Sequence, residues 1–389
     1  MEKVTFEVET ITPLFLAGND QIERDVTQKE ENDIIKTFKD WHIRAEIRAA
    51  SFRGLMRYWE RALVGGVLQT LDEVRQYEQK LFGATDCGSV ITVRVTQPTE
   101  TAQIYQKEKA EKKYPDEVKN GIYGRNYLFW SMDKSGKKFK SNFKAARFYY
   151  PDGTTFKVTL SIHGHEDKEK LEQAVVTLWL LTQLGGIGSR SRRCAGSLTA
   201  KVSSDKRQYK LPEKLLSLFE PTDTPEALQK QLEEGIKFAR ELYGFKEGAS
   251  GLPQKFDVLA KGACRIWVLH DGWKTVNEAM GVIGKSLQDY RRSITTTNGI
   301  YALMRRKVFG LPIIGFIPPQ FRQFQEELEK SRRSSPLMLK VTKLTNGEFV
   351  VVAVLFETLD SDGSRPDYNL IQDWILYRFS YSQRLEVAL

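Results

Sequence analysis

Apolar and polar residues alternate along four segments in the first half of the chain, and two further segments carry apolar residues at helical spacing. Alternation is typical of a strand with one buried face, and recurrence every three to four positions is typical of an amphipathic helix. The alternating segments are 4–16, 89–96, 156–162 and 197–202, and the helical ones are 51–64 and 168–184. With inserts left out, this is the βαββαβ order of a ferredoxin-like domain.

A further strand is predicted at 43–49, directly before the first helix. Its apolar residues alternate with charged ones that include Arg44 and Arg48, so one face is expected to be basic. Ser51 is expected to cap the helix that follows. Arg53 and Arg57 lie four residues apart on one flank of that helix. Strand and helix together predict a continuous basic strip.

The second half repeats the pattern less clearly. A strand is predicted at 264–269, a helix at 275–290, two strands at 336–344 and 349–356, and a helix at 370–379. The predicted fold class is therefore α+β, with two ferredoxin-like (RRM-like) βαββαβ domains that carry inserted loops and helices. The expected bounds are 1–203 for the N-terminal domain with an insert at 97–150, 204–255 for a helical connector, and 256–389 for the C-terminal domain.

Charge and composition add a preference for a negatively charged partner. The 389 residues contain 59 Lys and Arg against 50 Asp and Glu, a net charge of +9. Such an excess favours nucleic acid only if the charge is clustered. Cys87, Cys194 and Cys264 are far apart, and the N-terminus does not resemble a signal peptide. A cytoplasmic protein without a disulfide, metal or cofactor is expected.

The segment 185–197, called the glycine loop below, is the most informative part of the sequence. It holds four glycines, three serines and three arginines between a predicted helix and a predicted strand. Glycines permit close backbone approach, exposed N–H groups can form an anion-binding nest, and arginines clamp phosphate oxygens. A nucleotide-binding loop would instead precede a helix, and a plain helix cap would not need three arginines. The residues of this loop that are expected to bind RNA are Gly186, Gly188, Arg190, Arg192 and Arg193.

Other basic clusters lie in the second half, at 291–292, 305–307 and 332–333. Together with the glycine loop they would line a groove, with Arg332 and Arg333 expected to contact RNA. Aromatic residues that include Tyr123, Tyr127 and Trp130 are interleaved with basic residues in the insert. They either stack on unpaired bases or lie half-buried on a hairpin, and the sequence leaves both interpretations open.

One histidine, His42, could act as the general base of a metal-free ribonuclease. A surface histidine near phosphates is the simpler interpretation, and no H-E-x-x-H, paired-carboxylate or G-x-S-x-G motif is present. The predicted protein is therefore not an enzyme. The alternatives are a guide-RNA-processing endoribonuclease that uses His42, and a structural adaptor whose basic surface meets an acidic subunit.

The glycine loop before a strand resembles the signature of the RAMP superfamily of CRISPR proteins. Segments 12–18, 46–59, 81–83, 308–312 and 332–337 are similar, more narrowly, to the first RAMP subunits of Cmr-type (III-B) effector complexes. This resemblance implies two ferredoxin-like domains, no nuclease activity, and a place at the 3′-guide end that helps to hold guide RNA and single-stranded target RNA beside other Cmr subunits in antiviral defence. Cys194 departs from the family pattern, which usually has glycine there.

These observations combine into one hypothesis. Arg53 and Arg57 hold RNA phosphates together with the glycine loop, and Arg332 and Arg333 extend the track into the second domain. The hypothesis requires the glycine loop and the arginine row of the first helix to face the same cleft.

Overall fold

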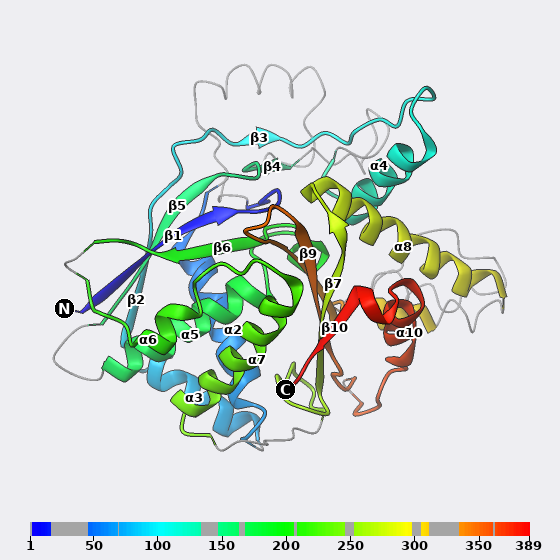
Figure 1. The fold of residues 1–389 in the computed structure, drawn as a ribbon. Coiled ribbons are helices and arrows are strands. Elements are labelled where there is room, and N and C mark those ends of the chain that lie inside the picture. The colour runs from blue at the N-terminus through cyan, green and yellow to red at the C-terminus, as the bar shows by residue number, and fades with distance from the viewer. Residues whose placement is uncertain are drawn as a thin grey trace, which may run out of the picture.

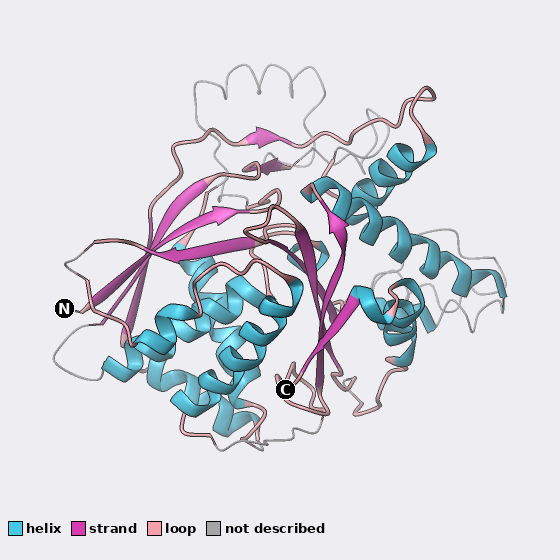
Figure 2. Ribbon diagram, in the orientation of Figure 1, coloured by secondary structure: helices cyan, strands magenta, loops and turns pink. Residues whose placement is uncertain are grey.

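The computed structural model describes residues 2–16, 46–68, 70–133, 147–162, 168–205, 208–245, 253–297, 305–310, 334–360 and 362–389. Figure 1 shows two sheets with helices packed between them and beyond the second. Figure 2 shows the same view with helices and strands distinguished by colour.

The first sheet contains four antiparallel strands, each formed by a segment that alternates in sequence. In chain order they are β1 (Lys3–Thr10), β2 (Ile91–Val95), β5 (Thr155–Ile162) and β6 (Leu198–Val202). Their order across the sheet is β2-β5-β1-β6. Helices α2 (Ala49–Val64) and α5 (Lys168–Leu184) connect them in the βαββαβ sequence of a ferredoxin-like domain.

The second sheet has the same topology. Its strands are β7 (Cys264–Trp273), β8 (Leu337–Lys343), β9 (Phe349–Phe356) and β10 (Arg384–Val387), in the order β10-β7-β9-β8. Helices α8 (Val276–Thr297) and α10 (Asn369–Arg378) take the two helical positions. The predicted α+β fold with two ferredoxin-like domains is confirmed. The division at residues 203 and 255 stays a prediction.

Helix α5 lies between the two sheets and determines how they are arranged. It contacts β5 and β6 of the first sheet on one side and β8 and β9 of the second on the other. Its side chains from Gln173 to Leu184 are all buried. A helix that is apolar all round needs such surroundings. Helices α8 and α10 cover the far face of the second sheet, so its strands are buried on both sides (Figure 1).

The remaining elements lie in the connector and the insert. The connector contributes α6 (Glu213–Ser217) and α7 (Pro225–Leu242), and α7 packs against α5 and β10. The insert contributes α4 (Asp116–Leu128) and the short paired strands β3 (Gln103–Ile104) and β4 (Phe148–Tyr149). Three short 3-10 helices complete the description: η1 (Ser191–Arg193), η2 (Arg306–Phe309) and η5 (Tyr381–Gln383).

The region before α2 differs from the prediction. Ala49 opens the helix, with Arg48 rather than Ser51 at the N-cap position, and residues 46–48 form no strand. The rest of the strand predicted at 43–49 lies outside the described residues. Helix α3 (Leu71–Phe82) was not predicted. Its start has a clear signal, because Thr70 and Glu73 cap each other reciprocally.

Glu60 on α2 is a charged residue in the interior of the first domain. Its carboxyl group is fully buried and accepts a hydrogen bond of 3.2 Å from the hydroxyl of Tyr243. Burial raises the pKa of Glu60 to about 8, although the hydrogen bond from Tyr243 acts in the opposite direction. Glu78 on α3 adds to the rise through charge repulsion. The folded protein therefore holds Glu60 protonated at neutral pH.

Replacing Glu60 by Gln is expected to flatten the pH dependence of stability. The pKa is higher in the folded chain than its ordinary value of 4.5, so unfolding releases a proton between about pH 4.5 and 8. In that window the free energy of unfolding falls as pH rises, by up to about 1.4 kcal/mol per pH unit. Urea unfolding should therefore show that the free energy of unfolding of Glu60→Gln, relative to that of the unaltered protein, rises by about 2 kcal/mol from pH 6 to pH 7.5. A difference between Glu60→Gln and the unaltered protein that stays constant from pH 6 to pH 7.5 would contradict the assignment.

Candidate nucleic-acid interface

The backbone of the glycine loop is directed into the protein. The N–H of Ser189 donates to the carbonyl of Phe15 at 2.8 Å, and the N–H of Gly196 donates to Pro13 at 2.9 Å. Gly188 has a φ of +88°, and a Cβ there would overlap the carbonyl oxygen of Phe15. The glycines thus let the loop pack on the chain that follows β1. The anion-binding nest that was expected from them is not formed by these N–H groups.

The same loop joins the two sheets. Cys194 donates its N–H to the carbonyl of Leu339 on β8 at 2.9 Å, and the hydroxyl of Ser197 accepts from the N–H of Val341 at 3.0 Å. The outer edge of β8 is therefore bonded to the first domain. Gly186 is buried in this junction, and a Cβ there would lie 3.0 Å from the carbonyl oxygen of Ala195. The RNA contacts predicted for Gly186 and Gly188 stay predictions, and their observed contacts are structural.

Arg193 is buried, with 7% of the residue exposed. Its guanidinium donates to the carbonyl oxygens of Phe309 at 3.0 Å and Leu337 at 3.4 Å. Burial, with a smaller contribution from the charges of Arg291 and Arg190, lowers its pKa to about 9. A phosphate could reach this side chain only by displacing carbonyl contacts, so we leave Arg193 out of the phosphate-binding set proposed below.

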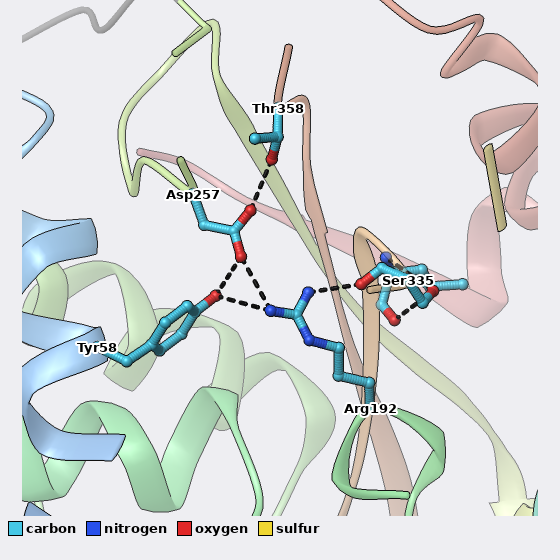
Figure 3. A network of polar contacts seen from close by, with 6 residues as sticks. Tyr58, Arg192, Asp257, Ser335 and Thr358 are labelled. Atoms are coloured by element: carbon cyan, nitrogen blue, oxygen red, sulfur yellow. Dashed lines mark hydrogen bonds and ion pairs between the residues drawn. The ribbon is translucent and has the colours of Figure 1, made fainter. Parts of the chain in front are cut away.

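Arg192 lies at the centre of a polar network that joins the two domains (Figure 3). Its guanidinium forms an ion pair with Asp257 at 3.0 Å and donates to the carbonyl of Ser335. Asp257 also accepts hydrogen bonds of 2.6 Å from the hydroxyls of Tyr58 and Thr358. Burial lowers the pKa of Arg192, but the charges of Tyr58 and Asp257 outweigh this and leave the pKa above its ordinary value. The positive charge of Arg192 is thus largely neutralised within the protein.

A groove of about 1040 Å³ opens beside Arg190 and Arg192. It is formed by the glycine loop, α4 of the insert, α8 and η2 of the second domain, and residues 334–335. Among the described residues that line it, no carboxylate is present. The basic residues that line it are Lys107, Arg190, Arg192, Arg193, Lys285, Arg291, Arg292 and Arg306. Such a groove has the charge expected of a polyanion-binding surface.

Two of the groove walls meet at an unusually close helix crossing. Helices α4 and α8 approach through glycines, Gly121 and Gly124 on α4 and Gly281 and Gly284 on α8. A Cβ on Gly124 would overlap the carbonyl oxygen of Gly281, and a Cβ on Gly284 would overlap the carbonyl oxygen of Gly124. The backbones can touch because neither helix has a side chain there. This crossing fastens the insert to the second domain and creates the groove.

Arginines inside the groove repel one another. Arg190 donates to the carbonyl of Leu128 at 2.7 Å, which satisfies one N–H without neutralising the charge. Burial, with a smaller contribution from the charge of Arg291, lowers its pKa to about 10. Burial likewise lowers the pKa of Arg306, again with a contribution from Arg291. All of these groups remain charged at neutral pH, so the groove concentrates positive charge that an anion would stabilise.

Within the part of the chain that the structure describes, Arg192 pairs with the carboxylate of Asp257 and Lys285 pairs with that of Asp289. Arg292 is exposed and Lys107 is half-buried, and no ion pair is found for either within the described ranges. Both are therefore positive charges of the groove that a phosphate could reach.

The arginine row of α2 has a different environment. Arg57 and Arg61 both form ion pairs with the buried carboxylate of Glu78 on α3. Arg53 donates to the carbonyl of Phe82 at the end of α3. None of the three lines the groove. The expectation that this row and the glycine loop face a common cleft is therefore not met among the described residues, because α3 occupies the flank on which the row lies.

Several predicted site residues cannot be placed. Arg44, His42, Arg332 and Arg333 lie outside the described residues. Arg48 is half-buried at the start of α2. The RNA contacts predicted for Arg44, Arg48, Arg53, Arg57, Arg332 and Arg333 stay predictions.

The open face of the first sheet is less suited to RNA. In RRM proteins this face carries aromatic residues on which bases stack. Here the outward-facing strand residues are threonine, serine, glutamate, lysine and arginine, among them Glu7 and Glu9 on β1 and Lys157 on β5. This mixed charge contrasts with the groove, where every charged lining residue is basic.

The basic clusters at 291–292 and 305–307 were predicted to line a groove with the glycine loop. Lys107 and Lys285, which also line it, were not predicted. The available signal was the pair of glycines three residues apart in each of two segments, 121 with 124 and 281 with 284. Within the described residues, no group of three or more His, Cys, Asp or Glu side chains could hold a metal ion. None of the described helices has both the length and the apolar character needed to cross a bilayer.

Comparison with known proteins identifies similar sequences. A family model described as the RAMP superfamily matches residues 7–199. The CRISPR system Cmr subunit Cmr1-2 of Pyrococcus furiosus is 29% identical over 208 residues, which cover 52% of this chain and 97% of that protein. The Cmr subunit Cmr1-1 of the same organism is 25% identical over 351 residues, covering 88% of this chain and 90% of that protein.

Solved structures share the fold over the whole chain. The crystal structure of Cmr1 from Pyrococcus furiosus in its apo form superposes with a TM-score of 0.60 at 20% identity, covering 100% of this chain and 99% of that one. A chain in the cryo-EM structure of the type III-B Cmr-beta complex bound to cognate target RNA gives a TM-score of 0.58 at 14% identity, covering 97% and 100%. At these identities the likeness concerns the fold.

Proposed function

The chain belongs to the RAMP superfamily, and on that premise we propose that it is a Cmr1-type subunit of a type III-B CRISPR effector complex that holds RNA without cutting it. The observation that carries this proposal is the groove between the glycine loop, α4 and α8. Eight basic side chains and no described carboxylate line it. A single strand of RNA supplies a row of phosphates that such a groove can follow.

The phosphate-binding set that we propose is Arg190, Arg291, Arg292, Arg306 and Lys107. Guanidinium forks suit phosphate oxygens, and contacts of this kind bind RNA without reading its sequence. Burial and mutual repulsion lower the pKa values of Arg190 and Arg306, and a bound phosphate would relieve that repulsion. The RNA is therefore expected to bind more weakly as salt rises.

The proposed partners are guide RNA, single-stranded target RNA and the other Cmr subunits, with the groove near the 3′ end of the guide. Such a complex would act in antiviral defence in the cytoplasm. The alternative of guide-RNA processing by His42 has no support from the described residues, because His42 lies outside them.

Replacing the two groove cations for which the described residues show no ion pair tests the proposal. Lys107→Gln with Arg292→Gln is expected to weaken the binding of single-stranded RNA by the full chain by about tenfold, since each phosphate contact contributes about 0.5–1 kcal/mol at an exposed site. The slope of log affinity against log salt should fall by about 1.4, or 0.7 for each phosphate. Equilibrium binding of labelled RNA at several salt concentrations measures both quantities.

The matched control is Lys210→Gln with Lys230→Gln, which removes the same charge from exposed positions on the connector. This control should bind as the unaltered protein does. Equal losses in the two double variants would contradict the groove as the binding site, and the absence of RNA binding by the unaltered chain at low salt would contradict the RNA-holding role.

A further inference from the structure

Two large aromatic side chains remain exposed on the groove wall that α4 and the turn after it provide. Tyr123 is 48% exposed and Trp130 is 42% exposed, although the neighbouring Phe129 is buried in the core at 2%. The segment that carries these residues is therefore well packed, and the rings of Tyr123 and Trp130 are exposed to solvent beside the basic residues of the groove. Exposed rings of this size in a groove point to a ligand with a flat apolar face.

The spacing of the aromatic residues places them along one side of the groove. Tyr123 and Tyr127 lie four residues apart on one face of α4, Trp130 lies in the turn that follows the helix, and all three line the groove. Four residues of α-helix advance about 6 Å along the axis. Since one base occupies about 3.4 Å along a stacked strand, successive rings are far enough apart to take separate bases.

Tyr127 differs from the other two. Its hydroxyl accepts a hydrogen bond of 2.7 Å from Arg291, and its ring is half-buried. Tyr127 is thus held as part of the basic wall. Tyr123 and Trp130 are the rings that remain accessible to a base.

The glycine loop and α8 supply most of the charge. Arg190 comes from the glycine loop, and Arg291 and Arg292 come from α8. A strand in the groove can therefore place its phosphates on the basic side and turn its bases toward the aromatic side. This combination of a basic track with aromatic platforms is how proteins bind single strands without reading their sequence. An acidic protein would satisfy the cations but offers no flat faces for the two rings.

We propose that Tyr123 and Trp130 stack on unpaired bases of the bound RNA, so that the groove selects single-stranded RNA over duplex. This inference rests on the proposed function and adds base contacts to the phosphate contacts. In a duplex the faces of the bases are covered by their neighbours, so only phosphates can be contacted. The insert between β2 and β5 is thus the element that makes the groove specific for unpaired RNA.

The test compares ordinary single-stranded RNA with an abasic strand of the same length and charge. The unaltered full chain should bind ordinary RNA on the order of 100-fold more tightly than the abasic strand, because stacking contributes about tenfold or more for each ring. Tyr123→Ala with Trp130→Ala should remove that difference. The same variant should bind the abasic strand as before, with an unchanged salt slope.

The control variant is Tyr377→Ala with Tyr381→Ala, two rings that are 88% and 87% exposed on α10 and η5. It should leave both affinities unchanged. Trp130→Phe should keep most of the preference, which separates stacking from a loss of folding. Equal binding of ordinary and abasic strands by the unaltered protein overturns the stacking role while leaving the groove intact. Failure to bind either strand overturns the proposed function itself, and competition by polyglutamate as effective as that by RNA would favour a protein partner instead.

Discussion

Gly124→Ala is expected to separate α4 from α8 and to lower the affinity for single-stranded RNA by about 100-fold, since the aromatic wall would be displaced. The added Cβ would overlap the carbonyl oxygen of Gly281 and lie 2.7 Å from the backbone nitrogen of Lys285. Both atoms belong to backbone, so only movement of a whole helix can relieve the clash. Such overpacking costs about 3 kcal/mol.

The neighbouring glycine provides a matched control. A Cβ on Gly121 would make one ordinary contact, 3.9 Å from the guanidinium of Arg125. Because alanine favours a helix by about 1 kcal/mol over glycine, Gly121→Ala should be neutral or stabilising. Hydrogen exchange of the α4 amides and the affinity for RNA should therefore both change in Gly124→Ala and not be impaired in Gly121→Ala. Similar behaviour of Gly121→Ala and Gly124→Ala would show that the crossing does not hold the groove together.

Asp257→Ala is expected to lower the free energy of unfolding by about 3 kcal/mol, the typical cost of removing one partner from a buried ion pair. Its carboxylate accepts from Arg192, Tyr58 and Thr358, and only 13% of its side chain is exposed. These three residues come from the glycine loop, α2 and the segment after β9. The substitution therefore loosens the junction between the domains.

Thr358→Val is the matched control, because it removes one of the three hydrogen bonds and should cost about 1 kcal/mol. Thermal or urea unfolding measures both variants. RNA affinity should not fall in Asp257→Ala, since the variant frees the positive charge of Arg192 at the groove. A stability loss no larger than that of Thr358→Val, or a marked drop in RNA affinity, would contradict the role assigned to this network.

The sequence was sufficient to predict most of the fold. Alternation located all four strands of the first sheet, because each has one face against a helix layer. Three strands of the second sheet were also predicted, although they are buried on both sides. The strand β10 was missed, since four residues are too few to show a period. Helix α4 was missed for a different reason. Its two glycines lower helix propensity, and the helix is stabilised by its crossing with α8, which no local pattern reveals.

The site was predicted less well, because sequence shows where charges occur but not how they are paired. From the sequence, Arg53 and Arg57 were predicted to belong to an accessible basic strip. In the structure, the charge of Arg57 is neutralised by Glu78, 21 residues away. Arg192 is neutralised by Asp257, 65 residues away. Such long-range pairs depend on the tertiary fold, so the accessible cations could be identified only in three dimensions.

Cys194 occupies a position whose backbone conformation favours glycine. Its φ is +66°, in the left-handed region that side chains adopt only with strain. The conformation is held by the hydrogen bond from its N–H to Leu339 and by the hydroxyl of Thr12, which donates to its carbonyl at 2.5 Å. The loop keeps a glycine-like shape although its residue has changed.

The burial of α5 between the two sheets has a consequence for how the protein can move. A repeated module suggests two bodies joined by a hinge, but each sheet uses the same central helix as its apolar support. Opening the halves would expose that helix to water, at a cost far greater than thermal energy. The groove has one wall from the insert of the first domain and another from the second domain. Because the two domains cannot move apart, the two walls stay at a fixed distance from each other. A strand of RNA would enter a channel whose width is already set before it arrives.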